Sequence, residues 1–428
     1  MGLFSSCWSL TIRLLITASI LLVILPNLPD NLFPSFPLDP VSYDMPKIDN
    51  FFTKVKWNSL ISDKAVPILK SKIIGPEALA VKGNKIYTGL GDGRLVVIDK
   101  ESLNIKTIAN LADPNAIGCG DNIIKNTSTC GRVLGLRFGD DSKLYFVDGA
   151  KGLYSYDLEI NKLSHIALGS STPWKGIYNS LVFDPKDNDL VYISVSSNRW
   201  TLDGILWSYL EMRPDGFVLA VNIKTGSVHK ILEGHIFYNG LDISPDKSSL
   251  LVSVTGEYKI LKVDLDIIKE SIQTDKPVTS VQVLVDGLPG APDNIHVFAN
   301  ELYIAMPALR LNSTLLDNLS SLPNVRKAVG RLANLLSRLL ILISEKVYSH
   351  PKLQYLSVEL LSGHVLTYAM PKASGVLIVD ANTGKLKRIL GSVYPLIADA
   401  TLDTNSGDLY LGSFKNDYLL KIKAKDLK

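Results

Sequence analysis

One strand–turn–strand phrase recurs along this chain, and the repeat limits the folds that the chain can adopt. Each copy has an apolar segment, a short turn and a second strand pattern, and most copies start roughly fifty residues apart. The six copies are PEALAVKGNKIYTG, VLGLRFGDDSKLYFVD, YNSLVFDPKDNDLVYIS, YNGLDISPDKSSLLVSV, PDNIHVFANELYIAM and ADATLDTNSGDLYLGS. This period is typical of four-stranded propeller blades. We therefore predict an all-β fold, a six-bladed β-propeller.

The last copy ends at the C-terminus without an outer strand. Residues 51–70 precede the first copy, and we expect them to supply that strand and close the ring. A seven-bladed ring would need a further copy, which the sequence does not show. The predicted propeller therefore covers residues 51–428.

A segment with a different period separates the last two copies. Within residues 307–362, apolar residues step by three or four, the spacing of one helical face. These residues are Leu315, Leu319, Leu322, Val325, Val329, Leu332, Leu336, Leu340 and Ile343. The pattern predicts a helical cap whose apolar face packs on the propeller. The alternative is a basic amphipathic surface that touches lipid headgroups through Arg326, Lys327, Arg331 and Arg338.

The N-terminus carries an apolar run, LLITASILLVIL, preceded by Arg13. We predict that residues 1–28 form a short cytosolic tip and an uncleaved signal-anchor helix, and that residues 29–50 form a Pro-rich stalk. A cleaved signal peptide is the alternative, although no small-residue cleavage site follows the run. The positive-inside rule then places the propeller in the lumen of the secretory pathway or outside the cell, as a single-pass type II protein of the endoplasmic reticulum or plasma membrane.

Two further features agree with that location. Sequons place candidate glycosylation sites at Asn126, Asn312 and Asn318. Cys119 and Cys130 bracket a polar loop and could form a disulfide in an oxidising compartment, the alternative being two buried thiols. The net charge is +3 with scattered Lys and Arg, so the sequence gives no indication of nucleic-acid binding.

Oxygen-bearing side chains recur at one position of the repeat. The first strand of each propeller blade lines the central channel, so equivalent positions form a ring around the axis. The residues two positions before the first apolar residue of each copy are Glu77, Leu134, Asn179, Asn239, Asp293 and Asp399, and Asn294 lies beside the ring. Oxygen ligands without Cys or His favour Ca²⁺. We predict a Ca²⁺ site formed by Glu77, Asn179, Asn239, Asp293 and Asn294; the alternative is that such residues only cap loops.

Several phrases at ordered intervals resemble the strictosidine synthase-like family. They include GPEALAV, CGRVLGLRFG, YNGLDISPD, LPGAPDNI and LYLGSF. The resemblance implies a six-bladed propeller, type II topology and a Cys119–Cys130 disulfide. It also implies Ca²⁺ in the channel, as in the related paraoxonases and gluconolactonase-type enzymes, whose ligand pattern maps onto Glu77, Asn179, Asn239 and Asp293, with Asn294 adjacent.

The chain departs from these relatives at catalytic positions. Leu134 stands where paraoxonase-like lactonases have a histidine, and Asp399 where strictosidine synthases have a glutamate. Val195 and Val254 replace acidic residues that the family often has. These departures argue against strictosidine synthase activity, and the chain keeps the residues of the metal ring better than the acid–base groups.

Two functions follow from these residues. The first is a weak Ca²⁺-dependent arylesterase or lactonase that acts on small hydrophobic esters or lactones, with Asp399 and Asp293 as candidate catalytic carboxylates. The second is a non-catalytic, membrane-displayed binding protein with a structural Ca²⁺. The six histidines are dispersed without metal-ligand spacing, and His296 faces the channel only if its strand register shifts by one residue.

Overall fold

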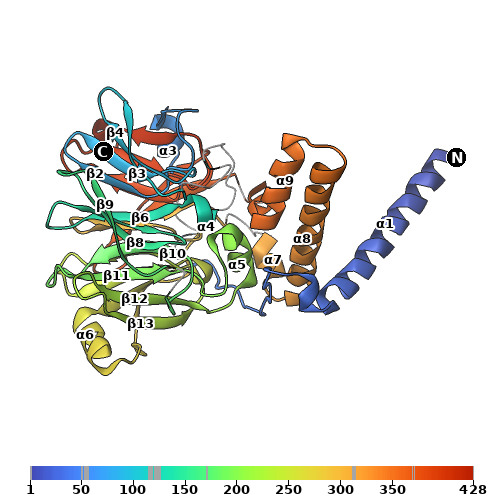
Figure 1. Ribbon diagram of the computed structural model, residues 1–428, viewed down its shortest axis with the longest axis horizontal. Coiled ribbons are helices and arrows are strands. Elements are labelled where there is room, and N and C mark those ends of the chain that lie inside the picture. Colours follow the sequence, from blue (N-terminus) through green and yellow to red (C-terminus); the bar gives the residue numbers. More distant parts are fainter. Residues whose placement is uncertain are drawn as a thin grey trace. The chain divides into compact units, whose positions relative to one another are not determined.

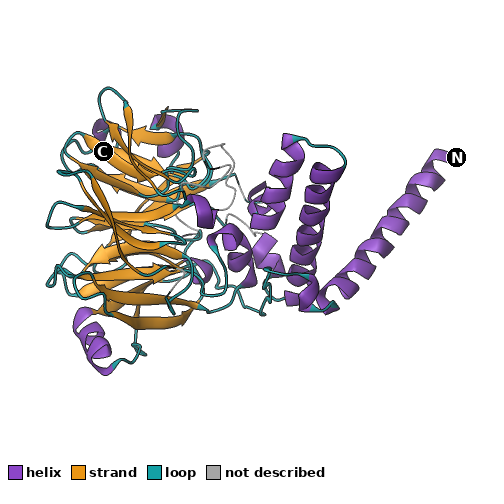
Figure 2. Cartoon of the chain, in the orientation of Figure 1, coloured by secondary structure: helices purple, strands orange, loops and turns teal. Residues whose placement is uncertain are grey.

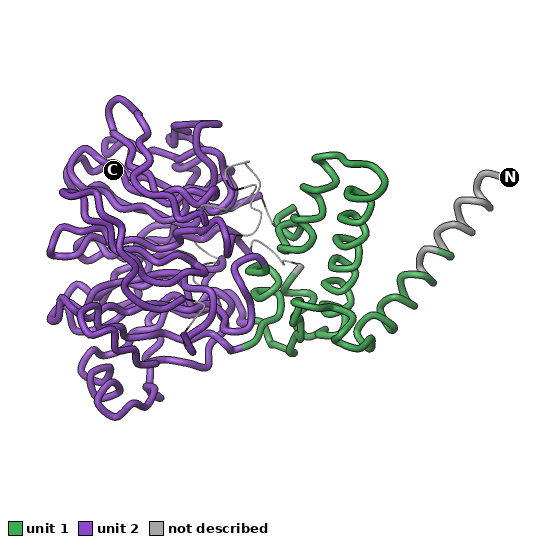
Figure 3. The backbone as a smooth tube through the Cα atoms, viewed as in Figure 1, with its two compact units in different colours: residues 1–45, 204–213, 315–369 green, residues 46–203, 214–314, 370–428 purple. Residues whose placement is uncertain are grey.

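Six separate sheets make up the larger part of the structure (Figures 1 and 2). The computed structural model describes residues 2–49, 52, 57–113, 119, 127–169, 172–310, 315–368, 370 and 372–427. These residues form two compact units, which Figure 3 colours separately. Residues 46–203, 214–314 and 370–428 form the propeller unit, and residues 1–45, 204–213 and 315–369 form the helical unit.

Each sheet has four antiparallel strands, and five of the six follow chain order. Those five are β2–β5 (Leu79–Lys82, Lys85–Gly89, Arg94–Asp99, Ile105–Asn110), β6–β9 (Val133–Phe138, Leu144–Asp148, Gly152–Asp157, Lys162–Ala167), β10–β13 (Tyr178–Phe183, Leu190–Val195, Gly216–Asn222, Val228–His235), β14–β17 (Tyr238–Ile243, Ser249–Val254, Lys259–Asp264, Gln282–Val285) and β18–β21 (Ile295–Phe298, Glu301–Met306, Ser374–Asp380, Leu386–Ser392). The first strands of neighbouring sheets contact one another in a closed ring, β2–β6–β10–β14–β18–β22. The predicted six-bladed propeller is therefore confirmed.

The sixth sheet joins the two ends of the propeller unit. Its order is β22 (Asp399–Leu402), β23 (Leu409–Gly412), β24 (Leu419–Ile422) and β1 (Val66–Ile68). Val66 and Ile68 pair with Lys421 and Leu419. The expectation that residues 51–70 supply the missing outer strand is thus confirmed.

The core of the propeller lies between adjacent sheets. Apolar residues of neighbouring blades interdigitate there, as where Leu241 and Val252 of one sheet pack with Val218 and Tyr192 of the next. Within its described residues the unit also contains the short helices α3 (Leu60–Lys64), α4 (Thr127–Cys130) and α6 (Leu265–Thr274). The 3₁₀ turns in the described part of the chain span Asp30–Leu32, Leu202–Gly204, Thr255–Glu257, His364–Tyr368 and Ala424–Asp426.

The helical unit contains α1 (Gly2–Asn27), α5 (Ile205–Glu211), α7 (Leu315–Leu319), α8 (Pro323–Lys346) and α9 (Pro351–Ser362). The predicted insertion is therefore helical, and Pro323 separates two helices as expected. The prediction that its apolar face is buried is wrong for Leu322, Val329 and Leu336, which are 46%, 39% and 42% exposed. The alternative basic surface is wrong in part, because Arg326 and Arg331 are buried.

The predicted anchor corresponds to α1, a single helix with Pro26 in its last turn. Across the described residues, no helix combines the length and apolarity that a membrane crossing needs. Cys119 and Cys130 form a disulfide with their Cα atoms 5.4 Å apart, which confirms that pairing. Asn318 is exposed on α7, whereas Asn126 and Asn312 lie outside the described residues.

Candidate metal centre

The polar ring residues begin the inner strands, and glycines of adjacent strands hold them close together. A Cβ on Gly240 would lie 2.7 Å from the carbonyl oxygen of Asp293, and a Cβ on Gly135 would lie 2.8 Å from that of Asn179. Real Cβ atoms do not approach backbone so closely, so only glycine fits. Gly240, which follows Asn239, lies inside β14 rather than in a turn. Its lack of a side chain is therefore required for the close contact between blades and not for a turn.

Three oxygens from three consecutive blades are buried and unsatisfied. They are Oδ1 of Asn179, Asn239 and Asp293, none of which has a hydrogen-bond partner within the described part of the chain. The side chains themselves are 2%, 3% and 6% exposed. Burial of acceptors without partners is costly. This arrangement is the strongest indication that the ring holds a ligand.

Hydrogen bonds around the ring fix the orientation of these side chains. Asn179 Nδ2 donates to Ser196 Oγ at 3.0 Å, and Ser196 Oγ donates to the Tyr238 carbonyl at 2.8 Å. The Asn239 side chain hydrogen-bonds to Asp293. Ser253 Oγ donates to the Asp293 carbonyl at 2.7 Å. The amide oxygens are thus oriented before any ligand arrives.

Glu77 has a cationic partner that the sequence did not reveal. Arg132 Nη2 lies 3.0 Å from Glu77 Oε2 and also donates to the Phe414 carbonyl at 3.0 Å. Both side chains of the ion pair are less than a tenth exposed. Arg132 therefore compensates part of the negative charge of the ring and competes with a metal ion for one oxygen of Glu77.

The carboxylates of the ring influence one another. Burial, and then the charge of Glu77, raises the pKa of Asp293 well above its ordinary value. Burial also raises the pKa of Glu77, although Arg132 opposes the increase. The charge of Asp399 raises both pKa values further. A bound cation would relieve this repulsion.

Asp399 is already satisfied by protein groups. Its Oδ2 accepts from the Leu79 backbone N–H at 2.7 Å, and its Oδ1 lies 2.6 Å from His296 Nε2. Thr401 Oγ1 donates to the same Oδ1 at 3.2 Å. Asp399 is thus suited to orient His296 rather than to bind a metal ion.

His296 and Arg132 are the two residues that sequence reasoning undervalued. His296 is buried next to the ring and stacks with Phe298 two residues further along β18, at 5.8 Å between ring centroids. The sequence predicted that His296 approaches the channel only after a one-residue shift in register, whereas β18 pairs with β19 without a shift and His296 still contacts Asp399. The CGR phrase before β6 was a sequence signal for Arg132, but its pairing with Glu77 depends on the closure of the ring.

A second charged side chain crosses the channel further along the inner strands. Arg137 of β6 donates to the carbonyls of Leu241 in β14 and Ile295 in β18, both at 3.4 Å. Neither strand neighbours β6 in the ring, so the side chain must reach across the channel. Its Nη2 also lies 4.0 Å from Asp242 Oδ2. The channel is therefore obstructed beyond the ring.

The donor set fits a hard cation. Among the described residues, no three or more His, Cys, Asp and Glu side chains are grouped to hold a metal ion. The unsatisfied oxygens of the ring belong to two amides and one carboxylate. Amide and carboxylate oxygens are the ligands that Ca²⁺ prefers, whereas soft metals prefer sulfur ligands. Asn294 lies beside them with its Nδ2 also unsatisfied, whereas Leu134, Val195 and Val254 are buried apolar residues that contribute no ligand.

Comparisons with known proteins agree with the sequence motifs. The strictosidine synthase family matches residues 179–266, and the strictosidine synthase-like N-terminal family matches residues 65–98. Adipocyte plasma membrane-associated protein from Salmo salar is 28% identical over 84% of this chain and 78% of its own length. The Rattus norvegicus protein is 26% identical over 91% of this chain and 94% of its own length.

Solved structures give a weaker likeness. A gluconolactonase from Xanthomonas campestris aligns with a TM-score of 0.49 and 13% identity, over 91% of this chain and 98% of that chain. Regucalcin from Agrobacterium tumefaciens, described as a calcium-binding protein, aligns with the same score over 84% and 93%. The chain is therefore similar to the strictosidine synthase-like family in two segments and to adipocyte plasma membrane-associated proteins over most of its length.

Proposed function

We propose that the propeller binds Ca²⁺ at its ring and hydrolyses small esters or lactones there. The observation that supports this proposal is the burial of three unsatisfied oxygens, from Asn179, Asn239 and Asp293, at the starts of three consecutive inner strands. Glu77 would supply a fourth oxygen through the atom that Arg132 does not bind. A bound cation would stabilise this donor set better than a bound water molecule, because a cation offsets the repulsion between the carboxylates of Asp293 and Glu77.

The protein residues around the ring provide the remaining chemistry. A bound Ca²⁺ would supply Lewis acidity toward a carbonyl oxygen. Asp399 holds His296 through Nε2, which leaves the Nδ1 side of the imidazole to accept a proton from water. Thr401 fixes the carboxylate of Asp399 in that geometry. Asp399 would therefore act by positioning the base rather than as the base itself.

A second candidate function is a structural Ca²⁺ in a non-catalytic binding protein. The extensive burial of the site favours it, because Asn179, Asp293 and Asp399 are 2%, 6% and 0% exposed. A substrate needs access to the reacting atoms, whereas a structural ion does not. Measurement of turnover separates the two functions.

We also propose that the propeller lies in the secretory lumen or outside the cell. The Cys119–Cys130 disulfide supports this location, since disulfides persist in oxidising compartments. The name of the relatives, adipocyte plasma membrane-associated protein, agrees with a location at a membrane. Removal of N-glycans by peptide-N-glycosidase should increase the gel mobility of the cell-expressed protein; unchanged mobility would argue against the use of Asn318 and the other sequons.

The experiment that tests the proposed function uses the full chain after treatment with a chelator. Isothermal titration with Ca²⁺ measures binding, and hydrolysis of phenyl acetate and of a small lactone measures activity. Asp293→Asn should weaken Ca²⁺ binding and abolish any activity. The matched control is Asp266→Asn on α6, a carboxylate of equal charge that is 79% exposed. An unchanged Ca²⁺ affinity in Asp293→Asn would contradict the ring, while Ca²⁺ binding without turnover would leave only the structural function.

A further inference from the structure

Helix α8 buries its polar and small residues and exposes its large apolar ones. From residue 328 to residue 344 the buried positions are Ala328, Gly330, Arg331, Ala333, Asn334, Ser337 and Ser344, and the exposed positions are Val329, Leu335, Leu336, Arg338, Leu339, Ile341 and Leu342. Leu339 and Leu342 are 50% and 54% exposed. A helix of a water-soluble protein shows the opposite distribution.

The same inversion continues on α9. Its buried residues are Ser357, Glu359 and Ser362, while Leu356 and Leu361 are 42% and 40% exposed. Ser337 Oγ of α8 donates to the Ser357 carbonyl at 2.7 Å, so a polar contact joins the two helices. Small residues and polar contacts between helices, with apolar residues outside, are typical of helices that contact lipid.

The buried arginines of α8 donate hydrogen bonds to backbone carbonyls of other segments of the helical unit. Arg326 donates to the carbonyls of Leu210 at 2.6 Å and Ser320 at 2.7 Å. Arg331 donates to the carbonyls of Leu25 at 2.9 Å and Leu28 at 2.6 Å, and pairs with Asp30. These cations satisfy backbone acceptors inside the unit, so they do not form a charged outer surface.

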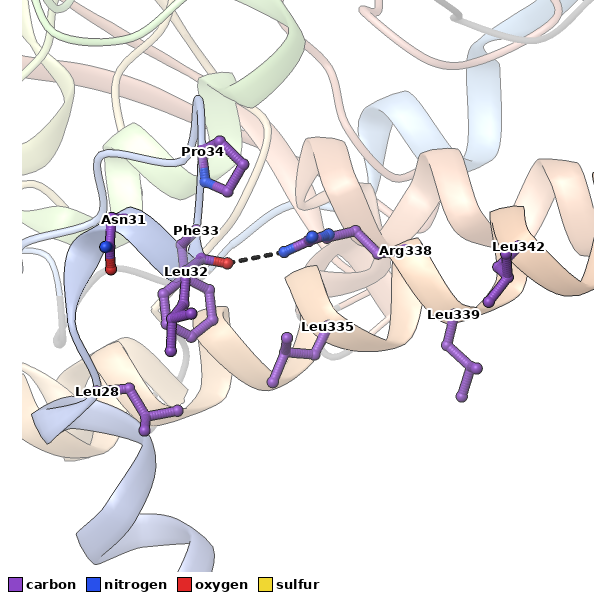
Figure 4. A pocket seen from close by; sticks show the side chains of 9 residues that line it. All are labelled: Leu28, Asn31, Leu32, Phe33, Pro34, Leu335, Arg338, Leu339 and Leu342. Atoms are coloured by element: carbon purple, nitrogen blue, oxygen red, sulfur yellow. Dashed lines mark hydrogen bonds between the residues drawn. The ribbon is translucent and has the colours of Figure 1, made fainter.

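An apolar groove of about 580 Å³ runs along the exposed face of α8 (Figure 4). Leu335, Leu339 and Leu342 line its helix side, and Leu28 and Leu32 lie on the other side. Arg338 Nη1 donates to the Leu32 carbonyl at 2.7 Å, so one donor of the guanidinium that borders the groove has a protein acceptor. The groove therefore offers hydrocarbon contacts and few unsatisfied polar groups.

We propose that this face of the helical unit, formed by Val329, Leu335, Leu336, Leu339, Ile341 and Leu342, lies against the hydrocarbon of a lipid bilayer. The face is continuous with α1, which contacts α8 and exposes Ile20, Val23 and Ile24. Its end has the composition of a membrane interface, because Tyr348 is 62% exposed between the exposed Lys346 and Lys352.

The exposed charges of α8 and α9 favour a bilayer with anionic headgroups. The charged side chains exposed on the described parts of α8 and α9 are Arg338, Glu345, Lys346 and Lys352, three cations against one anion. Anionic headgroups attract such a set. A second copy of the chain would present the same cations to itself, and is therefore the weaker occupant. This inference stands apart from the Ca²⁺ ring, since neither its residues nor its test involves catalysis.

The test measures the surroundings of a nitroxide label on the full chain in vesicles of phosphatidylcholine with a minority of phosphatidylserine. Cys7 is replaced by Ser, and single cysteines are introduced by Leu339→Cys or Leu342→Cys, both exposed positions at which a label need not disturb the fold. The control is Ile160→Cys, which is 67% exposed in the propeller. Collisions with oxygen report contact with hydrocarbon, and collisions with a water-soluble nickel chelate report contact with water.

Labels at 339 and 342 should collide strongly with oxygen and lose contact with the nickel chelate, while the label at 160 should keep it. Strong contact of the 339 and 342 labels with nickel in the vesicle sample would overturn the proposal by placing the face in water. Shielding from both reagents would overturn it in favour of a protein occupant, and failure of the protein to associate with vesicles would also overturn it.

Discussion

Arg132 and a metal ion would share Glu77, and two substitutions should separate their effects. Glu77→Gln removes a ligand charge and weakens a buried ion pair, so it should lower Ca²⁺ affinity roughly tenfold and the unfolding free energy of the metal-free protein by about 2 kcal/mol. Arg132→Met frees Glu77 and should raise Ca²⁺ affinity while destabilising the metal-free protein. Titration calorimetry and urea unfolding measure both quantities. Equal affinities in the two variants would show that Glu77 is not a ligand.

Glu257 gives the propeller a stability that depends on pH. Burial raises its pKa, but hydrogen bonds with His235 and Lys259 outweigh burial and lower the pKa to about 2. A carboxylate with a depressed pKa stabilises the fold above its unfolded value of 4.5, and this contribution, on the order of 3 kcal/mol, is lost as the pH falls toward 2. Unfolding free energy should therefore fall more steeply below pH 4.5 in the parent chain than in Glu257→Gln. Parallel curves would contradict the assignment.

Single residues of the site differed in how far the sequence could predict them. Asn179, Asn239 and Asp293 could be proposed as ligands because they occupy one position of a repeat, and the structure leaves an oxygen of each unsatisfied. The contact of His296 with Asp399 could not be predicted, because it joins residues 103 positions apart and depends on the exact register of two strands. Alternation along one strand cannot fix that register.

At the scale of elements, the contact between β14 and β18 depends on a glycine, Gly240, which has no side chain to separate the two strands. An added methyl group at Gly240 would lie 2.6 Å from the Ile295 nitrogen and 2.7 Å from the Asp293 oxygen. Gly240→Ala should therefore cost about 3 kcal/mol and weaken Ca²⁺ binding, because β18 must move. Gly83→Ala is the control, since φ there is +58° but no described atom lies within 4 Å, and it should cost about 1 kcal/mol. Equal losses in urea unfolding would refute a special role for the β14–β18 contact.

Helix α8 shows what a hydrophobic pattern can and cannot predict. The spacing of Val329, Leu332 and Leu336 correctly indicated a helix with one apolar side. The pattern could not say whether that side meets protein or another apolar medium, because both environments favour the same residues. The observed burial of Arg331 and Asn334 provides the distinction, which periodicity alone does not contain.

At the scale of the whole molecule, a cation held by several blades should act as a cross-link. Asn179, Asn239 and Asp293 come from the third, fourth and fifth sheets, so a bound Ca²⁺ would oppose their separation. Ca²⁺ at about a hundred times its dissociation constant should add about 2.7 kcal/mol to the stability. Differential scanning calorimetry should show a higher Tm with Ca²⁺ than with chelator, and Asn239→Leu should lose this gain. A Tm that does not respond to Ca²⁺ would contradict the cross-link.

The architecture was the most predictable level of all. Six copies of one phrase predicted six inner strands, and the incomplete last copy predicted that a strand from residues 51–70 would complete the ring. Both predictions depend only on local patterns repeated along the chain, which a single sequence contains. How the helical unit is built from residues 1–45, 204–213 and 315–369 could not be predicted, because no repeat relates these segments.

The pairing of β1 with β24 also sets the order in which the molecule can be completed. A ribosome makes Val66 long before Leu419, so the sixth sheet cannot form until β24 has left the exit tunnel. Until then the β1 segment has an unoccupied edge that a neighbouring nascent chain could capture. Chaperone binding during synthesis should therefore concentrate on this segment and end once β24 has left the exit tunnel.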